Sequence, residues 1–171
     1  MAKIIEYNPK YNNQIKNLLV ELQNYLIDID DWHTQVLLPN YKDDMFELDL
    51  NKVQNQNGKI YLAQQNNDIV GLVIGVVSET DEIDKLTNDC AKTGDVLELI
   101  VNNSIRGNGI GKILLDAIEK YFKSINCQRV NIEVFGPNKR GLNFYLKNNY
   151  TVRDLIVSKK TNLNIFESSR G

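Results

Sequence analysis

Scarce residue types exclude several kinds of site in this chain of 171 residues, which holds two cysteines, three prolines and one histidine. Cys90 and Cys127 lie far apart and belong to no Cys-x-x-Cys or histidine pattern, so neither a metal site nor a disulfide framework is indicated. No apolar run is long enough to span a bilayer, and the first residues contain no apolar signal core. We therefore expect free thiols, no metal, no membrane partner and a cytoplasmic location.

The composition that remains is that of a globular protein with two unlike halves. Hydrophobic residues make up 42% and charged residues 25%, and the length suits one domain with a sizeable core. Residues 1–100 carry 8 Lys and Arg against 17 Asp and Glu, whereas residues 101–171 carry 12 against 5. The basic residues are dispersed and are not interleaved with aromatics, so we expect no nucleic-acid partner. We interpret the halves as an acceptor side and an anion-binding side; the alternative is that solvated faces differ in sign.

Hydrophobic periodicity predicts alternating strands and helices. Alternating or continuous apolar residues predict strands at 3–7, 58–65, 69–77, 96–101, 129–135 and 151–160. One-face apolar spacing predicts helices at about 12–26, 41–53, 110–122 and 138–148. A turn at Asn66-Asn67-Asp68 makes a hairpin, residues 79–94 form a long loop, and residues 161–171 are an edge strand or a disordered tail. Residues 96–135 predict a right-handed strand-helix-strand unit with parallel strands.

The segment Arg106–Gly111 has the composition of a phosphate-binding loop, because glycines alternate between an apolar strand and an amphipathic helix. Glycines let consecutive backbone N–H groups converge on an anion, and a helix start adds unpaired amides and a positive dipole end. A dinucleotide fingerprint would need Gly or Ala in place of Lys112, and a P-loop would need Ser or Thr in place of Ile113. Both are excluded, which leaves Arg-x-x-Gly-x-Gly or an ordinary glycine-rich turn.

Two motifs in the basic half resemble those of one enzyme family. Arg106–Gly111 is similar to the acyl-CoA pyrophosphate loop of the GCN5-related N-acetyltransferases (GNAT). Residues 138–150 resemble the second motif of that family, with an asparagine, a small residue three positions on and an aromatic-tyrosine pair. Gly141 stands where alanine is usual, and Asn149-Tyr150 replaces Gly-Phe. Both departures keep the small side chain or the left-handed helix cap that the motif needs.

The order of the predicted elements matches the GNAT family from about residue 3 to 158, so the resemblance implies the fold of that family. It is a single α/β (α+β) domain with a mixed, mostly antiparallel central sheet of six to seven strands. A parallel βαβ core and about four helices belong to it. The acceptor-side half would be about 1–94, the acetyl-CoA-binding core about 95–158 and the tail 159–171.

The resemblance also implies that acetyl-CoA is the cosubstrate. Its pyrophosphate would be bound by the backbone amides of Arg106, Gly107, Asn108, Gly109, Ile110 and Gly111. Lys112 would add charge nearby, and the alternative for Arg106 is a plain surface cation. The pantetheine arm would pair, as an added strand, with the backbone of Leu99, Ile100 and Val101, which requires the two central parallel strands to part. Asn138 would hydrogen-bond the same arm.

The implied chemistry is acyl transfer from a thioester to an amine, which must lose a proton before it attacks. Glu98 is the candidate base, because it is the only ionisable residue in its apolar strand and desolvation raises a carboxyl pKa. The alternative is a solvated carboxylate at the sheet edge. By the resemblance Tyr145 is the candidate general acid; the alternative is a packed core aromatic. A backbone N–H near Ile100 would meet the oxyanion, and no covalent acyl-enzyme is expected.

The acceptor side is less patterned. His33, the only histidine, is a candidate base if its loop folds over the site, and is otherwise a solvated residue. Asp28, Asp30 and Asp31 with Trp32 form a candidate lip for a cationic amine. We therefore expect a small-molecule or peptide amine as acceptor and, from the family, a homodimer. The rival hypotheses are a non-catalytic acyl-CoA-binding sensor and a nucleic-acid-binding module.

Overall fold

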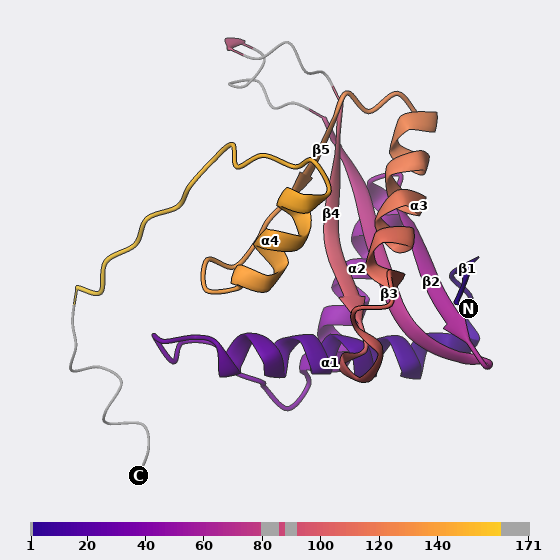
Figure 1. Ribbon diagram of the computed structural model, residues 1–171, viewed down its shortest axis with the longest axis horizontal. Helices are drawn as coiled ribbons and strands as arrows, with labels where there is room; N and C mark the ends of the chain where they lie inside the picture. Colours follow the sequence, from indigo (N-terminus) through magenta and orange to yellow (C-terminus); the bar gives the residue numbers. More distant parts are fainter. Residues whose placement is uncertain (1, 80–85, 88–91, 162–171) are drawn as a thin grey trace. The chain divides into compact units, whose positions relative to one another are not determined.

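Residues 2–79, 86–87 and 92–161 are described by the structure, a computed structural model (Figure 1). They fall into two compact units, one up to Lys139 and one from Arg140 onward, and each is considered by itself. The first unit contains β1 (Lys3–Glu6), η1 (Pro9–Tyr11), α1 (Asn12–Asp28), α2 (Tyr41–Asn55), β2 (Lys59–Gln65), β3 (Asp68–Glu79), β4 (Lys92–Val101), η3 (Asn103–Ile105), α3 (Ile110–Ser124) and β5 (Arg129–Ile132). Helix α4 (Lys139–Lys147) begins where the first unit ends.

One mixed sheet contains the strands in the order β1-β2-β3-β4-β5. Neighbouring strands are antiparallel except β4 and β5, which are joined through α3 and run parallel. The predicted fold class, a mostly antiparallel sheet with a parallel βαβ core and four helices, is confirmed. The expected six to seven strands are reduced to five over the described residues.

Helix α3 packs on one face of the sheet, where glycines let it approach closely. A Cβ at Gly75 would lie 2.6 Å from the ring of Phe122, and a Cβ at Gly94 would lie 2.4 Å from that ring. Leu114, Ile118 and Phe122 are fully buried, as the apolar spacing of this helix predicts. Close packing therefore holds α3 in place and, with it, the loop that precedes the helix.

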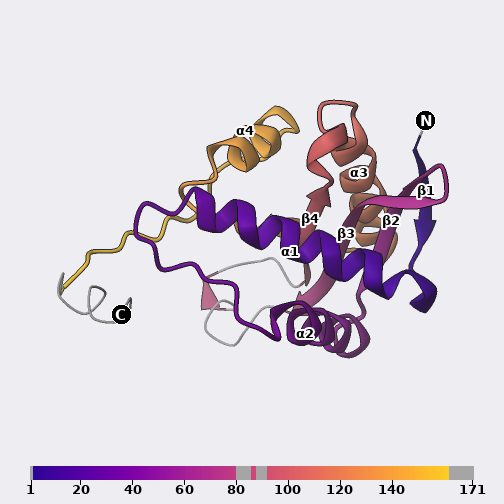
Figure 2. The ribbon, with the colours of Figure 1, turned by 90° about the horizontal axis from the view of Figure 1, so that it is seen from below.

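Helices α1 and α2 cover the opposite face of the sheet. Figure 2 shows α2 and α3 on opposite sides of the strands. The core on this side joins Leu72 and Ile74 of β3 to Leu19 of α1 and Phe46 of α2. Because α2 packs on β3, side chains on the inner face of α2 point toward the middle of the sheet.

The predicted hairpin between β2 and β3 is confirmed. Asn66 has φ 51° and Asn67 has φ 69°, and Gln65 pairs with Asp68 across the turn. Two successive left-handed residues make a type I′ turn, whose twist matches that of antiparallel strands. Asparagine tolerates this conformation, so the local sequence was sufficient to specify the turn.

The boundaries of the two parallel strands differ from the prediction. β4 begins at Lys92, inside the region 79–94 that was predicted as a loop, because Thr93 and Gly94 pair both with β3 and with β5. β5 ends at Ile132 rather than at residue 135, because its pairing with β4 stops there. The rest of the predicted loop lies largely outside the described residues. Partners on both sides, rather than polarity, decide the start of β4.

In the second unit, the strand predicted at residues 151–160 is absent, since these residues have no regular secondary structure. The prediction rested on β-branched residues such as Val152, Ile156 and Val157. Such side chains suit a pleated backbone, but a strand forms only where another strand supplies its hydrogen bonds. The tail from residue 162 lies outside the described residues.

Candidate active site

Strands β4 and β5 part partway along β4. Their parallel pairing joins Thr93–Val96 to Arg129–Ile132 and stops there. From Leu97 to Val101, β4 has a strand partner on one side only, β3, within the described part of the chain. This length of β4 therefore presents an edge to which an extended ligand can add by backbone hydrogen bonds. The parting that the predicted pantetheine site requires is present.

A bulge in β4 turns Glu98 toward α1 and α2. Val96 lies opposite Gly75 and Glu98 lies opposite Ile74, so Leu97 is an extra residue on β4. In a strand that alternated regularly through Leu97, Glu98 would share the α3 face with Val96, because side chains two residues apart lie on the same face. Because Leu97 is an extra residue, Glu98 instead faces the same side as Ile74, which belongs to the core beneath α1 and α2. One inserted residue thus decides which face of the sheet carries the carboxylate.

Glu98 is a buried carboxylate in the part of β4 that β5 has left. Its side chain is 9% exposed, so the alternative of a solvated residue is wrong. Burial raises the pKa of Glu98 to about 8, and the charge of Asp49 acts in the same direction while Lys52 opposes it. A carboxyl group with this pKa exchanges a proton readily near neutral pH, which suits a general base.

Asp49 on α2 is a second buried carboxylate, which the sequence analysis missed. It is 1% exposed, and neither of its oxygens accepts a hydrogen bond from any described residue. Burial raises the pKa of Asp49 to about 6. Burial also raises the pKa of Tyr41 to about 12, with further contributions from the charges of Glu98 and Asp49. The missed signal is spacing, since Asp49 falls three residues after Phe46 and four before Val53 on the apolar face of α2.

The glycine loop before α3 presents backbone amides without partners. Gly107 has φ 90° and Gly109 has φ 77°, a left-handed conformation that favours glycine. From Gly107 to Gly111, no backbone N–H donates a hydrogen bond to another described residue. A Cβ at Gly107 or Gly109 would meet no atom within 4 Å, so the space beside the backbone is open. This arrangement at a helix N-terminus fits a pyrophosphate group.

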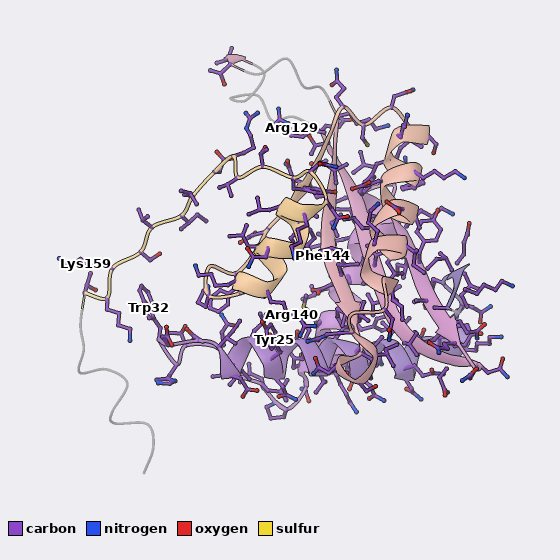
Figure 3. The ribbon with its side chains drawn as sticks, viewed as in Figure 1. Tyr25, Trp32, Arg129, Arg140, Phe144 and Lys159 are labelled. Atoms are coloured by element: carbon purple, nitrogen blue, oxygen red, sulfur yellow. The ribbon has the colours of Figure 1, made fainter. Side chains whose placement is uncertain are left out.

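Arg106 is held against α1, so the alternative of a plain surface cation is wrong. Its Nε donates a hydrogen bond of 2.7 Å to the carbonyl oxygen of Val101, and its Nη2 lies 3.8 Å from Oε1 of Glu21. The guanidinium carbon lies 5.6 Å from the ring centroid of Tyr25, which is labelled on α1 in Figure 3. Arg106 therefore ties the end of β4 and the glycine loop to α1.

Glu21 and Tyr25 on α1 support both predicted motifs. Oε1 of Glu21 accepts a hydrogen bond of 2.6 Å from the backbone N–H of Asn103, and Oε2 accepts one of 3.2 Å from Nδ2 of Asn102. One turn along the same helix face, the hydroxyl of Tyr25 donates a hydrogen bond of 3.2 Å to Oδ1 of Asn138. Helix α1 thus connects the glycine loop to the start of the second motif. Apolar spacing predicted the helix but not this role of its polar side.

The side chains of the other predicted donor-side residues differ in burial. Ile100 is 1% exposed and Ile110 is 5% exposed, so their side chains belong to the core. Leu99 and Val101 are half-buried along the open part of β4. Lys112 forms an ion pair with Asp116 one turn further along α3, on the exposed side of the helix.

In the second unit, Tyr145 packs among the aromatic rings around the end of its own helix. Its ring centroid lies 5.2 Å from that of Phe144 and 5.8 Å from that of Tyr150, in edge-on arrangements. Asn149 has φ 67°, and the N–H of Tyr150 donates to the carbonyl oxygen of Tyr145 at 3.1 Å. Asparagine therefore serves as the left-handed cap in place of the usual glycine, as the sequence analysis argued. The role of Tyr145 as an acid stays a prediction.

The comparison with known families decides the identity of the chain. Residues 26–150 match the family model described as the Acetyltransferase (GNAT) family. The chain belongs to the GNAT acetyltransferase family. Membership in this family of acetyltransferases does not specify the acceptor.

Individual relatives support the same family and fold. The chain is 29% identical over 97 residues to an uncharacterized N-acetyltransferase of Methanocaldococcus jannaschii, covering 56% of this chain and 54% of that protein. It thus spans about half the length of that relative. A solved predicted acetyltransferase from Clostridium acetobutylicum with acetyl-CoA has a TM-score of 0.68 at 19% identity, covering 94% of this chain and 96% of that one. Glucosamine-6-phosphate N-acetyltransferase from Arabidopsis thaliana has a TM-score of 0.62 at 17% identity, covering 95% and 99%. These two structures show the shared fold alone.

The acidic lip predicted for this GNAT protein is wrong for Asp30. Burial disfavours its charge, but hydrogen bonds from Gln35, Thr34 and Trp32 outweigh that effect and lower the pKa of Asp30 to about 2. Asp30 is therefore buried and stabilises the turn that follows α1 through both of its oxygens. His33 in the same turn is exposed and has φ 54°.

Other features of the GNAT chain lie apart from this site. In the described ranges, no group of three or more His, Cys, Asp or Glu side chains is arranged to hold a metal ion. No helix there has both the length and the apolar character needed to cross a membrane. A separate cavity of about 280 Å³ contains none of the predicted site residues; it is lined by Glu6, Tyr7, Leu50, Val53, Gln54, Gly58, Lys59 and Ile60.

Proposed function

We propose that the protein transfers an acetyl group from acetyl-CoA to a primary amine by direct attack in a ternary complex. The observation that carries the proposal is the open edge of β4 at Leu97–Val101, followed by the amides of Gly107–Gly111, which have no partner among the described residues. A ligand with an extended amide-containing arm and an anionic pyrophosphate suits these two neighbouring surfaces. Acetyl-CoA supplies there a thioester whose carbonyl carbon is open to attack by an amine.

On the donor side, the chain's backbone does most of the binding. The amides from Arg106 to Gly111 would hold the pyrophosphate, and the backbone of Leu99, Ile100 and Val101 would pair with the pantetheine arm. Arg106 fixes the position of the glycine loop relative to the end of β4, because its side chain donates a hydrogen bond to the carbonyl oxygen of Val101. Asn138, which accepts a hydrogen bond from Tyr25, is the further proposed contact to the arm.

On the acceptor side, Glu98 is the proposed base. Its carboxylate takes one proton from the ammonium form of the acceptor, and the neutral nitrogen then attacks. A backbone N–H near Ile100 stabilises the oxyanion, and Tyr145 gives a proton to the leaving sulfur. Burial of Glu98 and its raised pKa of about 8 support its part of the proposal. The assignment of Tyr145 rests on the resemblance of residues 138–150 to the family motif.

Ligand-dependent thermal unfolding tests the donor. Millimolar CoA or acetyl-CoA should raise the melting temperature by mass action, and NAD and ATP should do so much less. The absence of a shift with CoA would refute the proposed function. A salt-dependent gel shift with nucleic acid, without a CoA shift, would favour the nucleic-acid-binding alternative.

Release of free CoA thiol tests the reaction and finds the acceptor. A panel of amines should include at least one that releases thiol well above the rate of hydrolysis. CoA binding without thiol release from any amine would favour the non-catalytic sensor. With a good acceptor, Tyr145→Phe should lower turnover and leave CoA affinity nearly intact, and unchanged turnover would remove Tyr145 as the acid.

A further inference from the structure

We infer that Asp49 is a second carboxylate of the acceptor site and that, together with Glu98, it forms a subsite for the ammonium group of a cationic acceptor. The inference rests on the proposed function and deepens it by assigning the chemical class of the acceptor. Two buried carboxylates from different elements carry it, and one of them has no hydrogen-bond partner among the described residues.

Helix packing and strand register bring the two carboxylates together. The bulge at Leu97 directs Glu98 to the face of the sheet that α1 and α2 cover. Asp49 lies on the inner face of α2, in line with Phe46, which is part of the core on that face. Asp49 and Glu98 repel each other electrostatically, and both act on the hydroxyl of Tyr41. Three ionisable groups therefore converge under α2.

The charged groups around this pair leave Asp49 without a bonded counter-ion in the described part of the chain. Lys16 of α1 is bonded to Asp43, and Glu21 of α1 is bonded to Asn103 and paired with Arg106. Lys52 on α2 acts on the pair electrostatically but forms no ion pair with any described residue, and residues 69–77 of β3 are not ionisable. A buried carboxylate without a hydrogen bond is costly, so a proton or a cation from beyond the described residues would stabilise it.

An ammonium ion can supply both a positive charge and hydrogen-bond donors to the two carboxylates. With pKa values raised to about 6 and about 8, the two carboxylates hold about one proton and one negative charge at neutral pH. The negative charge attracts the ammonium group, whose own charge lowers the proton affinity of the pair, so the shared proton leaves to solvent. A neutral alcohol of the same shape has no such attraction.

The proton balance of a turnover follows from this arrangement. The ionised pair takes one proton from the ammonium nitrogen, the neutral nitrogen forms a bond to the thioester carbonyl carbon, and the carbon–sulfur bond breaks. The second nitrogen proton goes to the leaving sulfur, which departs as a thiol. One ammonium ion and one thioester thus become one amide, one thiol and one proton released to solvent.

Thermal unfolding of the CoA-saturated protein tests the subsite at neutral pH. The probe is 1,4-diaminobutane, compared with 1,4-butanediol at matched ionic strength and also without CoA. The diamine should raise the melting temperature of the wild type and the diol should not. Asp49→Asn should lose most of the diamine shift and keep the CoA shift. Glu47→Gln should keep both shifts, because Glu47 makes the same charge change on the exposed side of α2.

Each outcome of this experiment is decisive. Equal diamine shifts in the wild type and Asp49→Asn would overturn the role of Asp49. Equal shifts with diamine and diol would overturn the cationic class of the acceptor. A missing CoA shift with a retained, Asp49-dependent diamine shift would refute the proposed function and leave the cation subsite standing.

A second measurement needs no variant and covers the case in which Asp49→Asn fails to fold. Calorimetric titration of the wild type with 1,4-diaminobutane, in two buffers of different ionisation enthalpy, counts the protons released on binding. At pH 7 the wild type should release a substantial fraction of one proton per site, because the pair gives up its shared proton. Binding without proton release would overturn the inference.

With a folded Asp49→Asn, the rising limb of kcat/KM against pH should move to lower pH, because a negative neighbour of Glu98 is gone.

Discussion

The proposed donor side and the proposed acceptor side of this molecule offer opposite kinds of unpaired group among the described residues. Between Gly107 and Gly111 the unpaired groups are backbone amides at an open surface. At Asp49 the unpaired groups are carboxylate oxygens in the interior. Water satisfies an exposed amide when no ligand is bound, whereas nothing comparable satisfies a buried charge. The donor side therefore costs the fold little, and the acceptor side lowers its stability.

This contrast separates two ways of recognising a ligand. Backbone amides can bind a phosphate in any chain that supplies glycines with left-handed backbone angles before a helix. Buried carboxylates recognise an amine only where tertiary packing excludes water around them. A family can thus keep one donor loop while acceptors change with the residues on α2 and β4.

Glu98→Gln should give the largest effect, lowering turnover while leaving CoA binding unchanged. The amide of glutamine cannot take a proton from the acceptor, so kcat should fall by about 10² to 10⁴-fold. The CoA-induced shift in melting temperature should be unchanged, because Glu98 is not part of the glycine loop. Thiol-release kinetics with the best amine, beside Glu47→Gln as a charge-matched control, measures the effect. A loss of less than about fivefold would contradict the role of Glu98 as base.

Gly109→Ala should weaken CoA binding at the proposed donor side and leave the proposed acceptor residues unchanged. At φ 77° a Cβ costs about 1–2 kcal/mol, which either distorts the loop or destabilises the start of α3. We expect the Kd for CoA to rise by about tenfold, since 1.4 kcal/mol corresponds to a factor of ten. Gly136→Ala is the matched control, because Gly136 has open space around it and no left-handed angle. Calorimetric titration with CoA should separate the two variants, and equal Kd values would contradict the prediction.

The stability of the free protein should fall as pH rises from about 4 to about 8. Folding raises the pKa of Asp49 to about 6 and that of Glu98 to about 8, so the folded state binds more protons than the unfolded state in this window. Their stabilising contribution is complete below the unfolded pKa values and is lost as pH passes through the folded ones. The loss should amount to several kcal/mol.

Urea unfolding at several pH values measures this slope. Asp49→Asn should flatten it and raise stability at pH 8, because a buried charge without a partner is removed. Asp30 contributes in the opposite direction, since its lowered pKa gives stability that is lost only as pH falls toward 2. A slope that is identical in the wild type and Asp49→Asn would show that Asp49 titrates normally.

Tyr25→Phe should give the smallest effect, and it tests whether α1 holds Asn138 in position for CoA binding. The variant keeps the ring beside Arg106 and removes only the hydrogen bond of 3.2 Å to Asn138. A loss of about 0.5–1.5 kcal/mol is expected, with a rise in the Kd for CoA of less than about tenfold. Tyr7→Phe is the control, because it removes a hydrogen bond of 2.8 Å to Asn12 at the other end of α1. Equal Kd changes in both variants would argue against a specific support through Tyr25.

The sequence by itself determined what depends on neighbours along the chain. Apolar spacing predicted α3 at 110–122, and the helix is Ile110–Ser124. Two asparagines specified the hairpin turn, and glycine spacing picked out the loop whose amides have no partner. Each of these features depends only on residues close together in the chain, because their backbone angles and apolar spacing determine the local structure.

Only the tertiary structure decided what depends on partners from other elements. The strand predicted at residues 151–160 did not form, although its β-branched residues favour a pleated backbone. The bulge at Leu97 reversed the face of Glu98, because one added residue shifts the alternation of side chains along a strand. The packing of α2 on β3 then brought Asp49 to Glu98, and Glu21 and Tyr25 reached the glycine loop from α1. The glycine loop could be predicted from the sequence because its pattern is local. The position of the candidate base beside it depends on strand register and burial, which involve residues far apart in the chain.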